Sequence, residues 1–81
     1  MARVRYFAAA AEAAATEQET VPAASVGELV ATMTAAHGSE FERVLGRSSL
    51  LVNGRRTAVD AGDVPLEKDD SVDVLPPFAG G

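Results

Sequence analysis

Hydrophobic and polar residues alternate at the start of the chain with a period of two, which is typical of a strand with one buried face. The alternation runs through residues 2–7, so every second side chain would lie on the same side. One side would face a core, and the other would face away from it. The two predicted faces are Ala2, Val4 and Tyr6, and Arg3, Arg5 and Phe7.

Residues 71–75 alternate in the same way, with Val72 and Val74 inward and Asp73 outward. They predict the final strand. Residues 18–22 suit a short edge strand, because the proline that ends them cannot donate a hydrogen bond to a neighbouring strand. With the first strand, this segment would form a loose hairpin.

A second hairpin is predicted in the middle of the chain. Residues 49–52 are mostly apolar and are followed directly by Asn53 and Gly54. Both of these residue types tolerate the positive φ angles of a type I′ turn. We therefore expect residues 49–52 to pair with a returning strand at residues 57–59.

Two helices are indicated between these hairpins. Ser25 with Glu28 three residues later has the pattern of a capping box, and Gly38 is a typical residue after a helix end. Ser39 with Glu42 predicts a second, shorter helix that ends at a glycine. The apolar residues at helical spacing are Val26, Leu29, Val30, Met33 and Ala36 in the first, and Phe41, Val44 and Leu45 in the second.

Two other segments have weaker patterns. The alanine-rich run from Ala8 to Ala15 has high helix propensity but no N-cap and no clear apolar stripe, so we expect a surface helix or a loop. Residues 60–70 predict a loop, with Leu66 inserted into the core.

Taken in order, these segments predict an α+β domain over residues 1–75. A mixed sheet of about five strands would be covered on one face by one main helix and a short second helix. The chain has 81 residues, enough for one domain. Residues 76–81 would form a flexible C-terminal tail outside it.

The composition of the chain narrows the range of partners and reactions to be expected. The net charge of −5 disfavours nucleic acid and anionic membranes and favours a protein partner with a basic face. Without cysteine, the chain has no disulfide, no thiol nucleophile and no thiolate metal site, and we expect no metal to be bound. No run of about 20 apolar residues is present, so the default expectation is a cytoplasmic protein without a membrane contact.

Several polar residues have a simple structural interpretation. His37 stands at the end of the main helix, where the helix dipole favours a protonated imidazole, and no second ligand or nucleophile is spaced near it. The acidic residues between Glu67 and Asp73 lack the spacing of a metal loop and are expected in solvent. Arg55 and Arg56 are expected to be solvated in the hairpin turn.

The tail is the most informative segment. The chain ends Pro76-Pro77-Phe78-Ala79-Gly80-Gly81. Two prolines cannot donate to a sheet and favour an extended polyproline geometry, so this segment could reach on the order of 15–20 Å from the domain. Its small last residues could thread a narrow channel and present an unhindered carboxylate. The alternative is an inert frayed end.

Phe78 lies beyond the prolines, where the sheet could no longer bury it. We interpret Phe78, with Pro77 and Pro76, as a partner interface, since exposed aromatic side chains often anchor protein contacts. The alternative is that the ring folds back onto its own domain.

These features together resemble the MoaD/ThiS sulfur-carrier family of ubiquitin-like β-grasp proteins. The resemblance covers nearly the whole chain, and the Pro-Pro-x-x-Gly-Gly ending is its most specific part. It is closer to the molybdopterin-synthase branch than to the thiamine branch. The matching segments are Val4–Ala8, the helix with Leu29, residues 51–54, Leu66 with Asp69-Asp70, and residues 73–81.

The resemblance implies a protein that is modified by other enzymes and has no active site of its own. A ubiquitin-activating-type adenylyltransferase would use ATP to adenylate the carboxylate of Gly81. A sulfur donor of the cysteine desulfurase or rhodanese type would then convert it to a thiocarboxylate. Gly80 and Ala79 would thread beside it into a large synthase subunit, where the sulfur passes to a pterin precursor. The carrier itself would bind no cofactor.

Three alternatives stay open. The sulfur could serve thiamine, cysteine or specialised-metabolite synthesis. The chain could be a ubiquitin-like modifier joined through Gly81 to lysines of other proteins. It could also be a β-grasp binding module with an inert tail. The alanine-rich run and the Arg55-Arg56 pair depart from the pattern of many relatives, and they leave the identity of the partner open.

Overall fold

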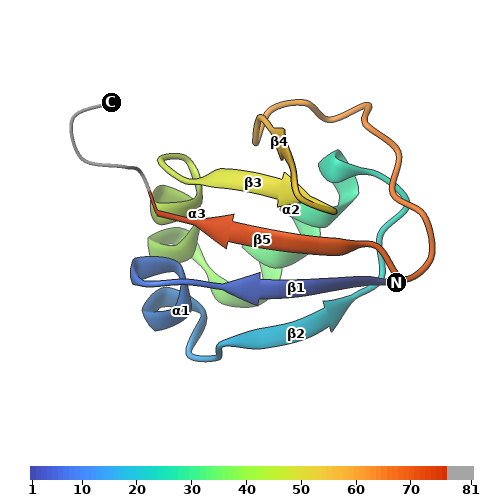
Figure 1. Ribbon diagram of the computed structural model, residues 1–81. Helices are drawn as coiled ribbons and strands as arrows, with labels where there is room; N and C mark the ends of the chain where they lie inside the picture. The colour runs from blue at the N-terminus through green and yellow to red at the C-terminus, as the bar shows by residue number, and fades with distance from the viewer. Residues whose placement is uncertain (77–81) are drawn as a thin grey trace.

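A five-stranded mixed sheet forms one layer of the protein (Figure 1), in a computed structural model that describes residues 1–76. The sheet order is β2-β1-β5-β3-β4. β1 and β5 are parallel, and the other neighbours are antiparallel. The strands are β1 (Ala2–Tyr6), β2 (Gln18–Val21), β3 (Ser49–Val52), β4 (Arg55–Thr57) and β5 (Ser71–Leu75).

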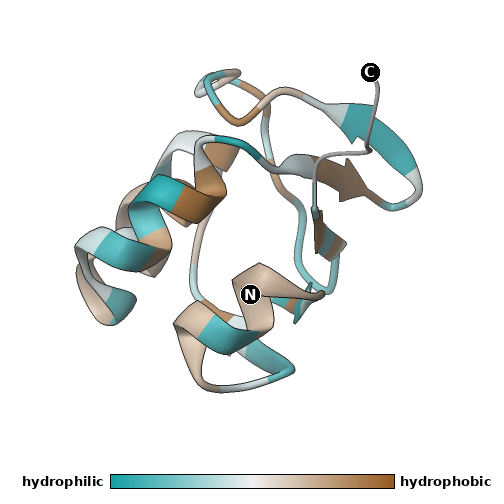
Figure 2. Cartoon of the chain, turned by 90° about the vertical axis from the view of Figure 1, so that its left-hand side faces the viewer, coloured by the Kyte–Doolittle hydropathy of each residue, from teal (hydrophilic) through white to brown (hydrophobic). Residues whose placement is uncertain are grey.

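Three helices cover one face of this sheet and leave the other face open (Figure 2). They are α1 (Ala9–Ala14), α2 (Val26–His37) and α3 (Ser39–Leu45). The predicted α+β arrangement is therefore confirmed. No helix within residues 1–76 is long and apolar enough to cross a membrane.

The start of α2 has the predicted Ser25 cap, whereas the Glu28 side chain reaches the amide one residue before the one that a capping box uses. The Ser25 hydroxyl accepts a hydrogen bond from the Glu28 amide at 3.2 Å, and the Glu28 carboxylate accepts one from the Ala24 amide at 3.3 Å. Two further amides of the first turn, those of Val26 and Gly27, donate to carbonyl oxygens of the loop that follows β4. The N-terminus of α2 is thus held by its own cap and by a distant segment.

The expected capping box of α3 is wrong. Ser39 is the first residue of the helix, and Gly38 is its N-cap, with φ of 91°. The amide of Glu42 donates to the Gly38 carbonyl at 3.1 Å, and no side chain caps the helix. Gly38 is the only residue between α2 and α3, so it takes the N-cap position, and Ser39 is already part of the helix.

The stripe predicted for α2 is correct for Val26, Leu29 and Met33 but wrong for Ala36, which is exposed. In the last turn the half-buried His37 lies on the sheet side instead, and its imidazole contacts the carboxylate of Glu19 in β2. A polar contact therefore replaces the expected apolar one in the last turn.

The middle hairpin forms, but its second strand starts earlier than the predicted residues 57–59. Asn53 and Gly54 have φ angles of 52° and 82°, as a type I′ turn requires. With only these two residues in the turn, pairing resumes at once between Val52 and Arg55. Arg55 and Arg56 are exposed, as expected, but they lie in β4 and not in the turn.

The alanine run forms α1, which is partly buried. Ala10 and Ala14 are in the core, and the helix contacts α3. Ala8 and Ala15, at its two ends, have positive φ angles of 55° and 59°. Short methyl side chains allow this close helix contact, which a sequence pattern without large apolar residues did not indicate.

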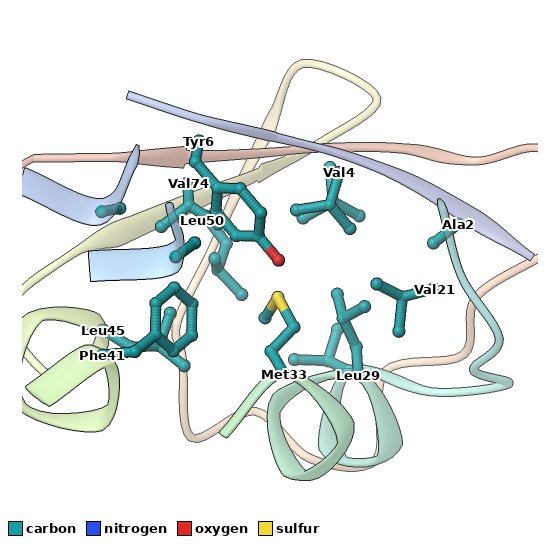
Figure 3. Close-up of a cluster of buried hydrophobic side chains, with 14 of the residues drawn as sticks. Ala2, Val4, Tyr6, Val21, Leu29, Met33, Phe41, Leu45, Leu50 and Val74 are labelled. Atoms are coloured by element: carbon teal, nitrogen blue, oxygen red, sulfur yellow. The ribbon is translucent and has the colours of Figure 1, made fainter. Parts of the chain in front are cut away.

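The core lies between the sheet and the helices (Figure 3). Side chains of the strands point down onto side chains of α2 and α3, and Leu66 is buried from the loop, as predicted. Complete burial of one large apolar side chain stabilises a fold by about 1.5–3 kcal/mol. The largest fully buried side chains are Phe41, Leu29, Met33, Leu45, Leu50, Val4, Val26, Val72 and Val74.

The backbones of α2 and of the loop after β4 lie very close together at Gly27 and Gly62, and this contact can be tested. A Cβ atom at Gly27 would lie 2.9 Å from the carbonyl oxygen of Gly62, whereas one at Gly46 would meet nothing nearer than 3.6 Å. We expect Gly27→Ala to lower the free energy of unfolding by about 1–3 kcal/mol, because helix and loop must separate. Urea denaturation would measure the change.

Gly46→Ala is the matched control. Gly46 has φ of −61°, which alanine adopts without strain, so its stability should stay within about 0.5 kcal/mol of the wild type. Equal stability of the two variants would contradict the packing described for Gly27.

Candidate functional site

The predicted functional tail follows the central strand of the sheet. β5 is paired on one side with β1 and on the other with β3. Its inward side chains, Val72 and Val74, are completely buried. A strand with neighbours on both sides and a buried face cannot shift without breaking the core, so the body of the protein fixes the point from which the tail departs.

The last hydrogen bonds of β5 define that point. The Phe7 amide donates to the carbonyl of Val74 at 3.1 Å, and Leu75 pairs with Ser49. Pro76, partly buried, follows directly and has no amide hydrogen to continue the sheet. Of the predicted site residues, the structure thus places Pro76 at the end of β5. Pro77, Phe78, Ala79, Gly80 and Gly81 lie outside the described residues.

Apolar side chains surround the end of β5 on the open face. Phe7, the residue after β1, is 38% exposed, whereas the neighbouring Tyr6 is buried on the helical side. Leu75 and Leu51 are half-buried on the same face. The alternation of residues 2–7 predicts this outward position of Phe7 but indicates no role for its ring. The residues that surround Phe7 are brought there by strand pairing, so the sequence could indicate only that its side chain points outward.

An ion pair crosses the open face beside these residues. The Arg5 guanidinium donates to both carboxylate oxygens of Asp73, at 2.8 and 2.9 Å. The same guanidinium lies 5.7 Å from the centre of the Phe7 ring. Hydrogen bonding to Asp73 raises the pKa of Arg5. This bidentate pair couples β1 to β5 in the register that places the tail.

A second polar network fixes the opposite end of β5. The Asn53 side chain donates to Asp70 at 2.9 Å and accepts from the Ser71 amide at 2.9 Å. Asp70 also accepts from the Glu67 amide at 2.7 Å. Hydrogen bonds from Asn53 and then from Glu67 hold the pKa of Asp70 below its ordinary value. Both ends of the central strand are therefore held by side chains.

The remaining polar cluster joins Tyr6, Glu19 and His37. The Glu19 carboxylate accepts from the Tyr6 hydroxyl and contacts His37 Nε2 at 2.6 Å. Burial alone would raise the pKa of Glu19, but the hydrogen bonds from Tyr6 and His37 outweigh it and lower the pKa. Burial and the Glu19 contact raise the pKa of Tyr6. This cluster ties β1 and β2 to α2, which agrees with the structural interpretation of His37.

Within residues 1–76 there is no group of three or more His, Cys, Asp or Glu side chains that could hold a metal ion. The buried side-chain polar atoms of this region all have hydrogen-bond partners. The polar side chains of the described domain thus hold its strands and helices together.

A mixed sheet of this order with a helical layer on one face is the ubiquitin-like β-grasp fold. The profile of the ThiS family matches residues 4–81, and the chain belongs to this family of ubiquitin-like sulfur carriers. No curated protein sequence matches the chain.

Solved structures agree with this assignment. SAMP1 from Haloferax volcanii is 26% identical, with a TM-score of 0.78 and coverage of 99% of this chain and 98% of that one. A Pyrococcus furiosus protein assigned as subunit 1 of molybdopterin converting factor is 27% identical, with a TM-score of 0.77 and coverage of 95% and 97%. In a complex of subunits 1 and 2 of this factor from Helicobacter pylori, the similar chain is 25% identical, with a TM-score of 0.73 and coverage of 99% and 97%.

The Glu19 cluster leads to a prediction about pH. The pKa of Glu19 is lower in the folded than in the unfolded chain, so its contribution to stability is complete above the unfolded value and is lost as pH falls through the folded value. Glu19→Gln should therefore reduce the free energy of unfolding by about 1–2 kcal/mol at neutral pH and by progressively less as the pH falls below the unfolded pKa of the carboxyl group. Urea titrations at neutral pH and at a series of acidic pH values measure this.

Glu17→Gln is the matched control. Glu17 is exposed, and its side chain makes no hydrogen bond within residues 1–76. Its loss should change stability by less than about 0.5 kcal/mol at either pH. A Glu19→Gln effect that persists unchanged in acid would rule out the charged form of Glu19 as its source.

Proposed function

We propose that this chain is a sulfur carrier that is adenylated and then thiocarboxylated at Gly81. The observation that carries the proposal is the point where the tail begins. The family match extends through residue 81, and the segment that ends in Gly80-Gly81 follows the central strand of the sheet, which is paired on both sides. A rigid body and a small terminal residue suit a substrate that must enter another protein's active site.

The chemistry requires two activating steps. A carboxylate oxygen of Gly81 attacks the α-phosphorus of ATP and displaces pyrophosphate. The terminal sulfur of a donor persulfide then attacks the carbonyl carbon and displaces AMP, and a thiol cleaves the resulting acyl disulfide to release the thiocarboxylate. Because the chain contains no cysteine, the persulfide and the thiol must come from other proteins or small molecules. An adenylating enzyme and a sulfur donor are therefore the partners that this function needs.

We further propose the small subunit of molybdopterin synthase as the specific role. Similarity to the Pyrococcus furiosus protein and to a chain of the Helicobacter pylori complex supports it, since the latter pairs subunits 1 and 2 of molybdopterin converting factor. The large subunit would then receive the tail, with Pro76, Pro77 and Phe78 at the contact and Ala79 and Gly80 in the channel. After the sulfur attacks the pterin precursor, hydrolysis by water of the bond between that sulfur and the acyl carbon would return Gly81 to a carboxylate.

A second candidate is a protein modifier. It is favoured by the similarity to SAMP1 of Haloferax volcanii, which is described as a small archaeal modifier protein. Both functions begin with the same adenylate of Gly81. They differ in the nucleophile that attacks it, which is a persulfide for the carrier and a lysine amine for the modifier.

Intact-protein mass spectrometry tests the carrier function. The purified chain is incubated with the adenylating enzyme of its source organism, ATP and a persulfide donor. We expect a mass gain equal to the exchange of one oxygen for sulfur, and its complete loss in a chain without Gly81. Gly46→Ala, a surface change in the loop after α3, should react like the wild type. Lysine-linked conjugates without any thiocarboxylate would instead support the modifier.

A further inference from the structure

Lysine is nearly absent from this chain. Of its seven lysine and arginine residues, Lys68 is the only lysine, and the other six are arginines. A lysine ε-amine loses its proton in a small fraction of molecules at neutral pH and is then a nucleophile. The arginine guanidinium stays protonated and offers no free electron pair. Lys68 is therefore the only side chain of this protein that can react as an amine.

Lys68 lies in the turn before β5, at the end of the sheet opposite to the start of the tail (Figure 1). The amide of the next residue, Asp69, donates to the Met1 carbonyl at 3.1 Å, so this turn is level with the residue before β1. Arg3, two residues after Met1, is level with the first residue of β5. At the rise of extended strands, the turn is thus roughly 20 Å from the last residue of β5.

Hydrogen bonds and core packing hold this turn in place. The Asp70 carboxylate accepts from the amide of Glu67 at 2.7 Å and from the side chain of Asn53 at 2.9 Å. Leu66, on the other side of Lys68, is buried in the core. The backbone that carries Lys68 cannot move toward the tail without breaking these bonds and withdrawing a core side chain.

The positive side chains near the start of the tail are arginines. Arg5 is paired in the sheet with Asp73, two residues before Leu75, and its guanidinium is bonded to that carboxylate. Arg47 lies two residues before Ser49, which pairs with Leu75. Arg47 is exposed and has no ion-pair partner within residues 1–76, so a lysine would supply the same charge at this position.

The difference between the two cations matters once Gly81 carries an adenylate. The nitrogen of an unprotonated lysine would bond to the Gly81 carbonyl carbon, AMP would leave with the electrons of the broken C–O bond, and the amine proton would pass to water. The product is an amide, and a persulfide does not displace an amine from it. One such reaction would remove the chain from the sulfur cycle.

Distance controls the rate of this self-reaction. Six residues span at most roughly 20 Å when fully extended, so Gly81 would approach Lys68 only with the whole tail stretched back along the sheet. An amine beside Leu75 would be within reach of many bent conformations. The effective concentration of two linked groups falls toward zero where the linker can barely span them. The position of a lysine therefore decides how often it meets the activated end.

We propose that this chain protects its activated end from its own lysine. Lys68 is confined to the far end of the sheet, and arginine supplies the positive charge beside the tail. This inference rests on the proposed function, because it concerns the adenylate of Gly81. If lysine and arginine served only as charges, exchanging their positions would have no effect.

That exchange is the test, and it leaves the composition unchanged. A variant with Arg47→Lys and Lys68→Arg has the same residues, mass and net charge as the wild type, and only the place of its one lysine differs. Lys68→Arg alone has no lysine and controls for reactions of other groups. Circular dichroism verifies that each variant is folded.

Each full-length chain is prepared by intein cleavage with a thioester at Gly81, which replaces the adenylate without any enzyme. The thioesters are incubated in dilute solution at mildly alkaline pH, and intact-protein mass spectrometry follows the products. An internal amide has a mass one water below that of the hydrolysed chain. We expect the exchanged variant to form it at least about tenfold faster than the wild type, while Lys68→Arg behaves like the wild type. Tandem mass spectrometry should locate the amide at residue 47.

Other results would overturn the inference. Equal rates of amide formation in the exchanged variant and the wild type would reject the protection, and a wild-type chain that still gains sulfur in the carrier assay would leave the proposed function standing. A wild-type chain that gains no sulfur in that assay would reject the proposed function and, with it, the need for protection, whatever the thioesters do.

Discussion

The pairing of β5 with both β1 and β3 is the constraint on which the rest of the structure depends. The parallel contact between β1 and β5 joins the two ends of the domain, and the antiparallel contact with β3 joins the middle hairpin to them. Val72 and Val74 bring the face of this strand into the core. Because contacts between distant parts of a chain cost the most loop entropy, the sheet cannot close until its last strand is in place. The stability of the domain and the point where the tail begins are thus set by the same residues.

Much of this architecture could be predicted from local patterns. The alternation in β1 and β5, the Ser25 cap and the Asn53-Gly54 turn are each written in adjacent residues, and each was found where it was expected. The errors arose where tertiary context changed a local preference. A one-residue link placed Ser39 inside α3, and a contact with Glu19 selected His37 over Ala36. Alanine methyl groups made α1 a packed helix without any periodic signal of large side chains.

The candidate site divides in the same way. The end that we propose to be reactive was inferred from the residue types and their order alone, since the properties of two prolines and two glycines do not depend on contacts within the fold. The support around it was not predictable, because Arg5 and Asp73 are 68 positions apart and meet only through strand pairing. Phe7 and Leu75 became neighbours for the same reason. Local patterns indicated which side of a strand a residue occupies, but not which residues it meets there.

Charge shows most clearly why the fold is needed to interpret the sequence. A net charge of −5 suggests a partner with a basic surface. The net charge, however, adds up the charges of all faces of the protein, and a partner contacts only one of them. Alternation in β1 and β4 directs Arg3, Arg5 and Arg56 to the open side, while most of the carboxylates lie on the helices and in the loop before β5. Positive charge therefore predominates on the open face, where the carboxylate of Asp73 is paired with Arg5. At physiological salt, charges are screened over about 8 Å, so a partner responds mainly to the face that it approaches. The charge that a partner meets on the open face therefore has the opposite sign to the net charge of the chain.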